Sequence, residues 1–175
     1  MKQMLALVMA VTLMTIGCTS VPDGLSPVGG FEPERYLGKW YEIARLDHSF
    51  ERNMTNVSAT YTRGENGDIR VYNRGFNTEN QEWKDIEGKA RFLGEETTGS
   101  LKVSFFGPFY GGYHIIELDQ EDYTYAMVTG PTRSYLWILS RTREIDTALY
   151  AELVSVADRW GFDTSQLIKV QHDKQ

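Results

Sequence analysis

The sequence lacks several features that other classes of protein need. Its 175 residues include one cysteine, so no disulfide can form within the chain. Eighteen basic side chains stand against 24 acidic ones, a formal net charge of −6, so the positive field needed to bind a phosphate backbone is missing. We therefore expect no nucleic-acid partner. The length fits one domain, and 41% apolar residues are enough for one hydrophobic core.

A hydrophobic run long enough to cross a bilayer is also missing. The apolar run at residues 4–16 is shorter than the roughly 20 residues that a membrane-spanning helix needs. It follows Lys2 and ends at Gly17 and Cys18, an arrangement typical of a secretory signal peptide. Residues 1–17 are therefore predicted to be a signal peptide.

The end of this segment resembles the lipobox of bacterial lipoproteins, in which the cysteine becomes the acylated first residue. That resemblance implies that Cys18 is a lipid anchor to a membrane. Thr19 in the next position implies the outer membrane of a Gram-negative bacterium. A free Cys18 after an ordinary signal peptide is the alternative. Residues 18–30 are rich in Pro, Gly and Ser and are predicted to be a flexible tether. The folded domain is expected at residues 31–175.

Apolar and polar residues alternate in short segments from residue 38 onward, with turn residues between them. We expect strands at residues 38–46, 57–62, 68–73, 88–93, 100–106, 112–118, 123–129 and 134–141. Consecutive short strands with one polar face are typical of an antiparallel meander. Eight of them close a barrel that holds side chains or one small ligand. The predicted fold is all-β, an eight-stranded antiparallel up-and-down barrel.

One segment near the C-terminus has a helical period instead. Its apolar residues fall on one face of a helix and are Ile145, Leu149, Leu153, Val156 and Trp160. Thr142 is expected to cap the start and Gly161 the end. The apolar face is expected to pack outside the barrel, against Leu136 and Ile138. A last short strand is expected near residues 167–170.

Three short motifs in the predicted strands and turns resemble the signatures of the lipocalin family. Gly38 and Trp40, on the first strand, resemble the Gly-x-Trp signature, residues 122–123 the second and Arg141 the third. The resemblance implies that Arg141 lies over the indole of Trp40 and that both, with Gly38, close one end of the barrel. It is closest to bacterial lipocalins of the outer membrane. It implies binding, storage or transport of fatty acids or lysophospholipids, for maintenance of the envelope, without a cofactor.

Strand parity, counted from Trp40 and Arg141, predicts which side chains of the first and eighth strands line the lumen, and apolarity selects the inner faces of the other strands. The predicted ligand-binding residues are Ala44, Val57, Ala59, Tyr61, Ile69, Val71, Ala90, Phe92, Leu101, Val103, Phe105, His114, Ile116, Ala126, Val128, Tyr135, Trp137 and Leu139. Small residues among them leave room for a ligand, and an apolar lining suits an acyl chain. Parity also points Glu42 inward, where its charge must stay hydrated, be paired or lie near the mouth.

Patterns that carry catalysis are missing. The histidines at positions 48, 114 and 172 fall on separate predicted segments without metal-ligand spacing, and the one thiol is that of Cys18. We expect neither an enzyme nor a metal site. Two alternatives stay open, a structural or partner-binding lipoprotein with a filled barrel and an enzyme acting on small lipids. A homodimer is also compatible with the sequence, which leaves the preferred lipid and head group open.

Overall fold

The computed structural model describes residues 18–174, and the predicted signal peptide at 1–17 lies outside them. Its elements in chain order are α1 (Pro33–Tyr36), β1 (Gly38–Arg45), β2 (Met54–Arg63), β3 (Ile69–Asn77), β4 (Glu82–Phe92), β5 (Ser100–Phe106), β6 (Phe109–Leu118), β7 (Tyr125–Thr129), β8 (Leu136–Ser140), α2 (Thr147–Arg159), the 3₁₀ turn η1 (Thr164–Gln166) and β9 (Ile168–Lys169). None of the helices in this part of the chain is long and apolar enough to span a bilayer.

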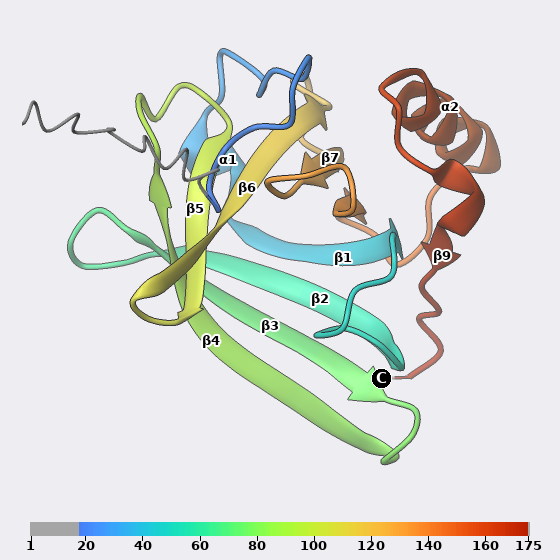
Figure 1. The fold of residues 1–175 in the computed structure, drawn as a ribbon. Helices are drawn as coiled ribbons and strands as arrows, with labels where there is room; N and C mark the ends of the chain where they lie inside the picture. Colours follow the sequence, from blue (N-terminus) through green and yellow to red (C-terminus); the bar gives the residue numbers. More distant parts are fainter. Residues whose placement is uncertain (1–17, 175) are drawn as a thin grey trace, which may run out of the picture.

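The strands form one antiparallel sheet that closes on itself (Figure 1). Each strand from β2 to β7 pairs with the next along the chain, and β1 pairs with both β8 and β2. The short β9 adds to β1 at the edge facing α2. This confirms the predicted eight-stranded up-and-down barrel with a helix outside it, and the predicted last strand near residue 168.

The hairpin of β3 and β4 is longer than the sequence indicated. Its register is unbroken from the pair Ile69 and Ala90 to the pair Asn77 and Glu82. Alternation is lost at Gly75, which has no side chain to show which face it occupies. A Cβ there would lie 2.9 Å from the Cε of Met54, so the glycine makes room for a β2 side chain.

Four strands contain a register shift. The shifts lie between Glu42 and Ala44 on β1, between residues 55 and 58 on β2, between residues 103 and 106 on β5, and between Ile115 and Glu117 on β6. A bulge puts one extra residue into a strand, so every side chain beyond it moves to the other face. The bulges on β1 and β6 change which residues line the lumen.

Helix α2 packs on the outer wall as expected, with Leu153 and Ala157 buried in a cluster that includes Leu136 and Ile138. The predicted cap at Thr142 is wrong. Asp146 caps the helix instead, because its carboxylate accepts from the N–H groups of the first turn, at 2.8 and 3.3 Å.

The hydroxyl of Thr142 is used in a turn, where it donates to the carbonyl of Glu144 at 2.6 Å. At the other end of α2, Gly161 has a φ of +80° and follows the last helical turn, as expected.

The prediction of a flexible tether at residues 18–30 is wrong for the described structure. Main-chain hydrogen bonds tie this segment to the barrel, from Gly112 to the carbonyl of Cys18 (2.7 Å) and from Val28 to that of Ile115 (2.8 Å). Gly99 in turn donates to Val28 (2.9 Å). Pro and Gly suit a linker by composition, but they also suit an irregular strap held by backbone bonds. We call residues 18–30 the N-terminal strap.

Candidate functional site: the barrel interior and its two ends

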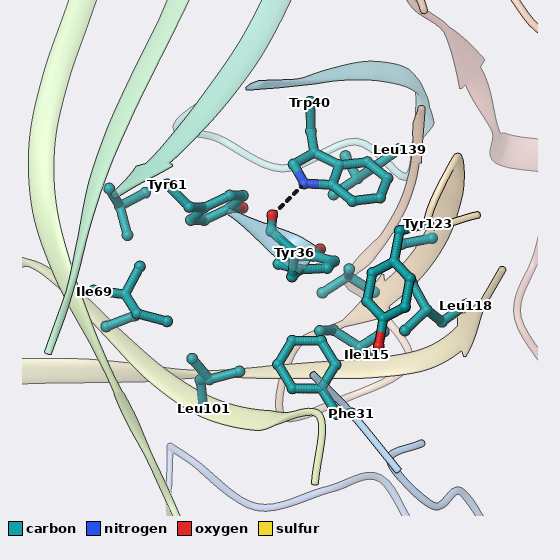
Figure 2. Close-up of a cluster of buried hydrophobic side chains, with 14 residues drawn as sticks. Phe31, Tyr36, Trp40, Tyr61, Ile69, Leu101, Ile115, Leu118, Tyr123 and Leu139 are labelled. Carbon is teal, nitrogen blue, oxygen red and sulfur yellow. Dashed lines mark hydrogen bonds between the residues drawn. The ribbon is translucent and has the colours of Figure 1, made fainter. Parts of the chain in front are cut away.

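The barrel has two different ends. Helix α1 and Arg141 lie at one end, which we call the base. The loops at residues 46–53, 78–81, 107–108 and 130–135 lie at the other, which we call the mouth. A cluster of buried apolar side chains fills the space nearer the base (Figure 2).

Most of the predicted lining lies in or against this cluster. These residues are Ala59, Tyr61, Ile69, Val71, Ala90, Phe92, Leu101, Val103, Phe105, Ala126, Val128, Trp137 and Leu139. Val57 is buried, and its Cγ2 lies 3.2 Å from the Cβ position of the lumen-facing Gly75. Tyr135 is half-buried at the mouth and stacks with Trp137, with ring centroids 6.0 Å apart.

Three predicted lining residues do not face the lumen. Ala44 and Ile116 belong to the outer cluster under α2. The bulge on β1 reverses parity at Ala44, whereas on β6 the inner face was assigned to the wrong alternating set. His114 also points outward, and Tyr113 and Ile115 take the inner face of β6. His114 is covered by the N-terminal strap, where its Nε2 donates to the carbonyl of Ser20 at 3.0 Å. Burial lowers the pKa of His114, so a neutral ring fits its environment.

The base is closed by Arg141 and Trp40. The guanidinium carbon lies 3.9 Å from the centre of the indole ring, as the family resemblance implied. Arg141 also donates to the carbonyls of Arg35 (2.6 Å), Lys39 (3.1 Å) and Tyr123 (3.2 Å). Gly38, with a φ of +94°, brings the start of β1 within van der Waals reach of this guanidinium. The contact stabilises the barrel by joining α1, β1 and the β6–β7 turn.

Aromatic residues that the sequence analysis missed fill the lumen above this plug. Phe31 and Tyr36 enter from the segment before β1, and the indole of Trp40 donates to the Tyr36 carbonyl at 2.8 Å (Figure 2). The Tyr113 hydroxyl bonds those of Tyr36 (2.7 Å) and Tyr61 (2.8 Å). Burial raises the pKa of each of these three phenols, so they stay neutral and serve as hydrogen-bonding groups.

The mouth contains a buried ion pair. Arg45 donates to Glu42 at 2.7 Å, and both side chains are almost fully buried. Three residues apart on a regular strand they would face opposite ways, and the bulge at residues 42–44 brings them to the same side. Arg45 also donates to the carbonyls of Glu51 (2.8 Å) and Met54 (3.1 Å), which fastens the 46–53 loop across the mouth.

A second carboxyl lies beside this pair. Glu51 accepts from the indole of Trp137 at 3.0 Å and lies 3.1 Å from the Nε2 of His48. Burial raises the pKa of Glu42 well above its ordinary value of 4.5, and the nearby Glu51 raises it further, while Arg45 opposes both. These surroundings favour retention of a proton on Glu42.

The inner wall between base and mouth keeps accessible surface. Ala59, Phe92 and Val103 face the lumen against the buried cluster and are nevertheless only partly buried. Asn73 follows Val71 on the same face of β3, and its buried Oδ1 has no hydrogen-bond partner within residues 18–174. In the same part of the chain, no three His, Cys, Asp or Glu side chains are grouped to hold a metal ion.

The chain was compared with known protein families and sequences. The model of the lipocalin-like domain matches residues 31–172. The chain is 52% identical over 155 residues to the outer membrane lipoprotein Blc of Vibrio cholerae, which covers 89% of this chain and 91% of that protein. It is 50% identical over 173 residues, 97% of each chain, to the outer membrane lipoprotein Blc of Escherichia coli. A plant relative, temperature-induced lipocalin-1 of Arabidopsis thaliana, is 37% identical over 81% of this chain and 80% of its own.

Among solved structures, insecticyanin of Manduca sexta is similar, with a TM-score of 0.69, 18% identity and coverage of 87% of each chain. At that identity the likeness concerns the fold, and it agrees with the closed barrel and outer helix described above. The family model and the bacterial relatives together cover nearly the whole described chain. The chain therefore belongs to the lipocalin family.

Proposed function

We propose that this protein is a non-catalytic lipid carrier, anchored to the outer membrane through Cys18, that holds one acyl chain in its lumen. The observation that carries the proposal is the accessible apolar surface left on the inner wall at Ala59, Phe92 and Val103. A barrel that its own side chains filled completely would bury such residues. The similarity to outer membrane lipoproteins supports the location.

The energetics of an acyl chain fit this lumen. Each buried CH₂ contributes about 0.8 kcal/mol, so a chain of about 16 carbons gains at most about 13 kcal/mol. Association and ordering oppose this by roughly 4 to 15 kcal/mol, which leaves micromolar or somewhat better affinity. The unpartnered Oδ1 of Asn73 can accept a hydrogen bond from a hydroxyl or ammonium group. The lumen can therefore hold a polar head group beside Asn73. Fatty acids and lysophospholipids both supply the acyl chain, and a lysophospholipid also supplies a hydroxyl donor.

Native mass spectrometry with and without added palmitate or lysophospholipid tests the carrier function. We expect one lipid per barrel. Ala59→Trp should weaken binding at least tenfold, about 1.4 kcal/mol, because the indole occupies the space of the chain. Thr60→Trp, one residue along on the other face of β2, is the matched control and should leave the affinity unchanged. A parent barrel that takes up no lipid would favour a structural or partner-binding lipoprotein.

The anchor is tested separately. Cys18→Ala should abolish metabolic labelling with a clickable fatty acid and move the protein to the soluble periplasmic fraction, because no other cysteine is present. A variant that still labels and sediments with outer membranes would disprove the anchor.

A further inference from the structure

The N-terminal strap fixes the position of Cys18 on the barrel. The N–H of Gly112 donates to the Cys18 carbonyl at 2.7 Å, and two residues on His114 donates to the carbonyl of Ser20 at 3.0 Å. Because a carbonyl only accepts, Nε2 of His114 carries the proton and Nδ1 accepts from the Ser100 hydroxyl, at 3.0 Å. The exposed Cys18 is therefore held against the outer side of β6.

Two adjacent glycines on β6 differ in whether the strap needs them. A Cβ on Gly112 would lie 2.7 Å from Nε2 of His114 and 3.3 Å from the main chain of Thr19. A Cβ on Gly111 would meet no atom within 4 Å. Only Gly112 is required for the close approach of the strap, which makes the two positions a matched pair for experiment.

The outer wall beside Cys18 carries positive charge in cross-strand pairs. Gly112 lies opposite Lys102 on β5, and Lys102 lies opposite Arg91 on β4. Arg70 lies opposite Lys89 in the same way. Like charges placed directly opposite destabilise a sheet. None of these four cations forms an ion pair within residues 18–174, so they are free to meet anions from outside.

Acidic groups offset part of this charge, because Glu65, Asp68 and Glu87 line one surface depression with Arg70 and Lys89. Arg91 and Lys102, which are nearer Gly112, are not among the residues of that depression. Glu96, in the loop before β5, is already paired with Arg63 at 3.1 Å. The wall thus keeps an excess of cations in a chain whose net charge is −6.

Exposed aromatic residues border the same wall. Phe106 and Phe109 lie opposite each other at the end of the β5–β6 hairpin and are 74% and 78% exposed. Beside them, Nζ of Lys102 lies 4.8 Å from the centre of the Tyr110 ring. Phe109 is three residues from Gly112, about 10 Å along the strand. Aromatic rings together with cations are typical of surfaces that lie at the boundary of a bilayer.

We infer that the outer wall of β4, β5 and β6 is a docking surface for a bilayer containing anionic phospholipid. The site combines the fixed Cys18, the cations Arg91 and Lys102 and the phenylalanines of the hairpin tip. The barrel then lies on its side on the membrane, with β4, β5 and the first half of β6 toward the bilayer and α2 turned away from it, beside the end of β6 at Ile116 (Figure 1). This orientation rests on the proposed attachment to a membrane, and it adds which face meets the lipid.

Vesicle binding by the chain from residue 18, which contains the whole closed barrel, tests the surface without the acyl chains. Binding to phosphatidylcholine vesicles should rise when phosphatidylglycerol is included. Arg91→Glu with Lys102→Glu should reduce this binding about tenfold or more, since each cation contributes near an anionic surface. Arg159→Glu with Lys169→Glu makes the same charge change on the α2 side and should have no such effect. Equal losses in both pairs would show a net-charge effect and overturn the proposal.

Phe50 distinguishes a barrel lying on its side from one with its mouth on the membrane, because the β5–β6 hairpin tip and the loop of Phe50 both lie at the mouth end. Phe109→Ser should weaken vesicle binding several-fold, whereas Phe50→Ser, at a 64% exposed position on the 46–53 loop, should not. A comparable or larger loss for Phe50→Ser would overturn the inference in favour of the mouth. Palmitate affinity in the same proteins reports on the lumen alone, so failure of the carrier function and failure of the docking surface are separate outcomes.

The acylated protein in vesicles gives a second, direct measurement. The tryptophan fluorescence that Phe109→Trp adds should be quenched by brominated phospholipid. The fluorescence that Phe50→Trp adds should not be quenched. Gly112→Ala, which displaces the strap, should reduce the quenching at position 109, and Gly111→Ala should preserve it. Quenching that is insensitive to Gly112→Ala would show that the strap does not set the orientation.

Discussion

The base of the barrel contains a half-buried arginine and the mouth a buried one, and the two are held very differently. At the base, Arg141 lies on Trp40 and donates to three carbonyls that no titration can alter. At the mouth, Arg45 is paired with Glu42, and a second carboxyl, that of Glu51, lies beside them. The plug at the base is therefore independent of pH, whereas the contacts of Arg45 at the mouth depend on the protonation of Glu42.

The largest effect is expected where a buried charge loses its partner. Arg45→Met leaves Glu42 and Glu51 together without a cation and releases the mouth loop, so we expect it to lower the free energy of unfolding by about 4 kcal/mol. The double variant with Glu42→Gln should recover part of this loss, because a buried amide needs no counter-charge. Urea unfolding measures both. A double variant no more stable than Arg45→Met would show that the ion pair is not the source of the loss.

Loss of the plug at the base should cost less. Arg141→Ala removes one cation–π contact and three hydrogen bonds at a partly exposed site, which we expect to total about 3 kcal/mol. Arg141→Lys keeps the charge but loses the planar guanidinium, so its free energy of unfolding should lie between those of the parent and Arg141→Ala. The preference for acyl-chain length should not change in either variant. An unchanged denaturation midpoint in Arg141→Ala would contradict a structural role for the plug.

Between the two ends, the tyrosine cluster gives a smaller effect. Tyr113→Phe leaves the buried hydroxyls of Tyr36 and Tyr61 without their shared partner, so we expect a loss of about 2 kcal/mol in thermal or chemical unfolding. Tyr110→Phe, on the outer face of the same strand, is the control and should stay within about 0.5 kcal/mol of the parent. Equal stability of the two variants would show that the cluster is not well satisfied in the parent.

The smallest effect is a dependence on pH that distinguishes the mouth from the base. The raised pKa of Glu42 means that the folded state binds a proton more tightly than the unfolded chain. Stability from this group is therefore complete below pH 4.5, the ordinary value, and is lost as the pH rises toward the raised pKa. Glu42→Gln should lose less stability than the parent over that interval. Parallel curves of unfolding midpoint against pH would contradict the shift.

Much of the barrel could be predicted from sequence because period-two alternation survives on β7 and β8 and over long stretches of β2 and β5. It fails where a bulge intervenes, and a bulge is defined by the partner strand, which no single segment shows. For that reason Ala44 was placed wrongly and Arg45 was missed as a lumen residue. His114 and Ile116 were placed wrongly because both faces of β6 carry apolar side chains. The cap at Asp146 was missed because Thr142 has the same capping chemistry, and only the hydrogen bonds distinguish them.

The strap was misjudged for another physical reason. Its contacts are main-chain hydrogen bonds, which leave no trace in side-chain composition. The pair at Gly111 and Gly112 was the available signal, since a glycine on a strand often marks the close approach of another backbone. The charge pattern on the outer wall was readable too, but only the register shows that Lys102 and Arg91 are opposite each other.

The C-terminal tail adds a constraint on when the barrel can be completed. The bulges on β1 and β2 leave main-chain groups that the tail takes up, with Val170 donating to the carbonyl of Ile43 at 2.9 Å and Asn56 to that of Gln171 at 2.7 Å. The seam between the first strand and the rest of the sheet thus includes residues far along the chain from β1, and contacts this distant in sequence form slowly. Until the tail has joined this seam, these main-chain groups of β1 and β2 stay open to pairing with another chain, which is a route to aggregation.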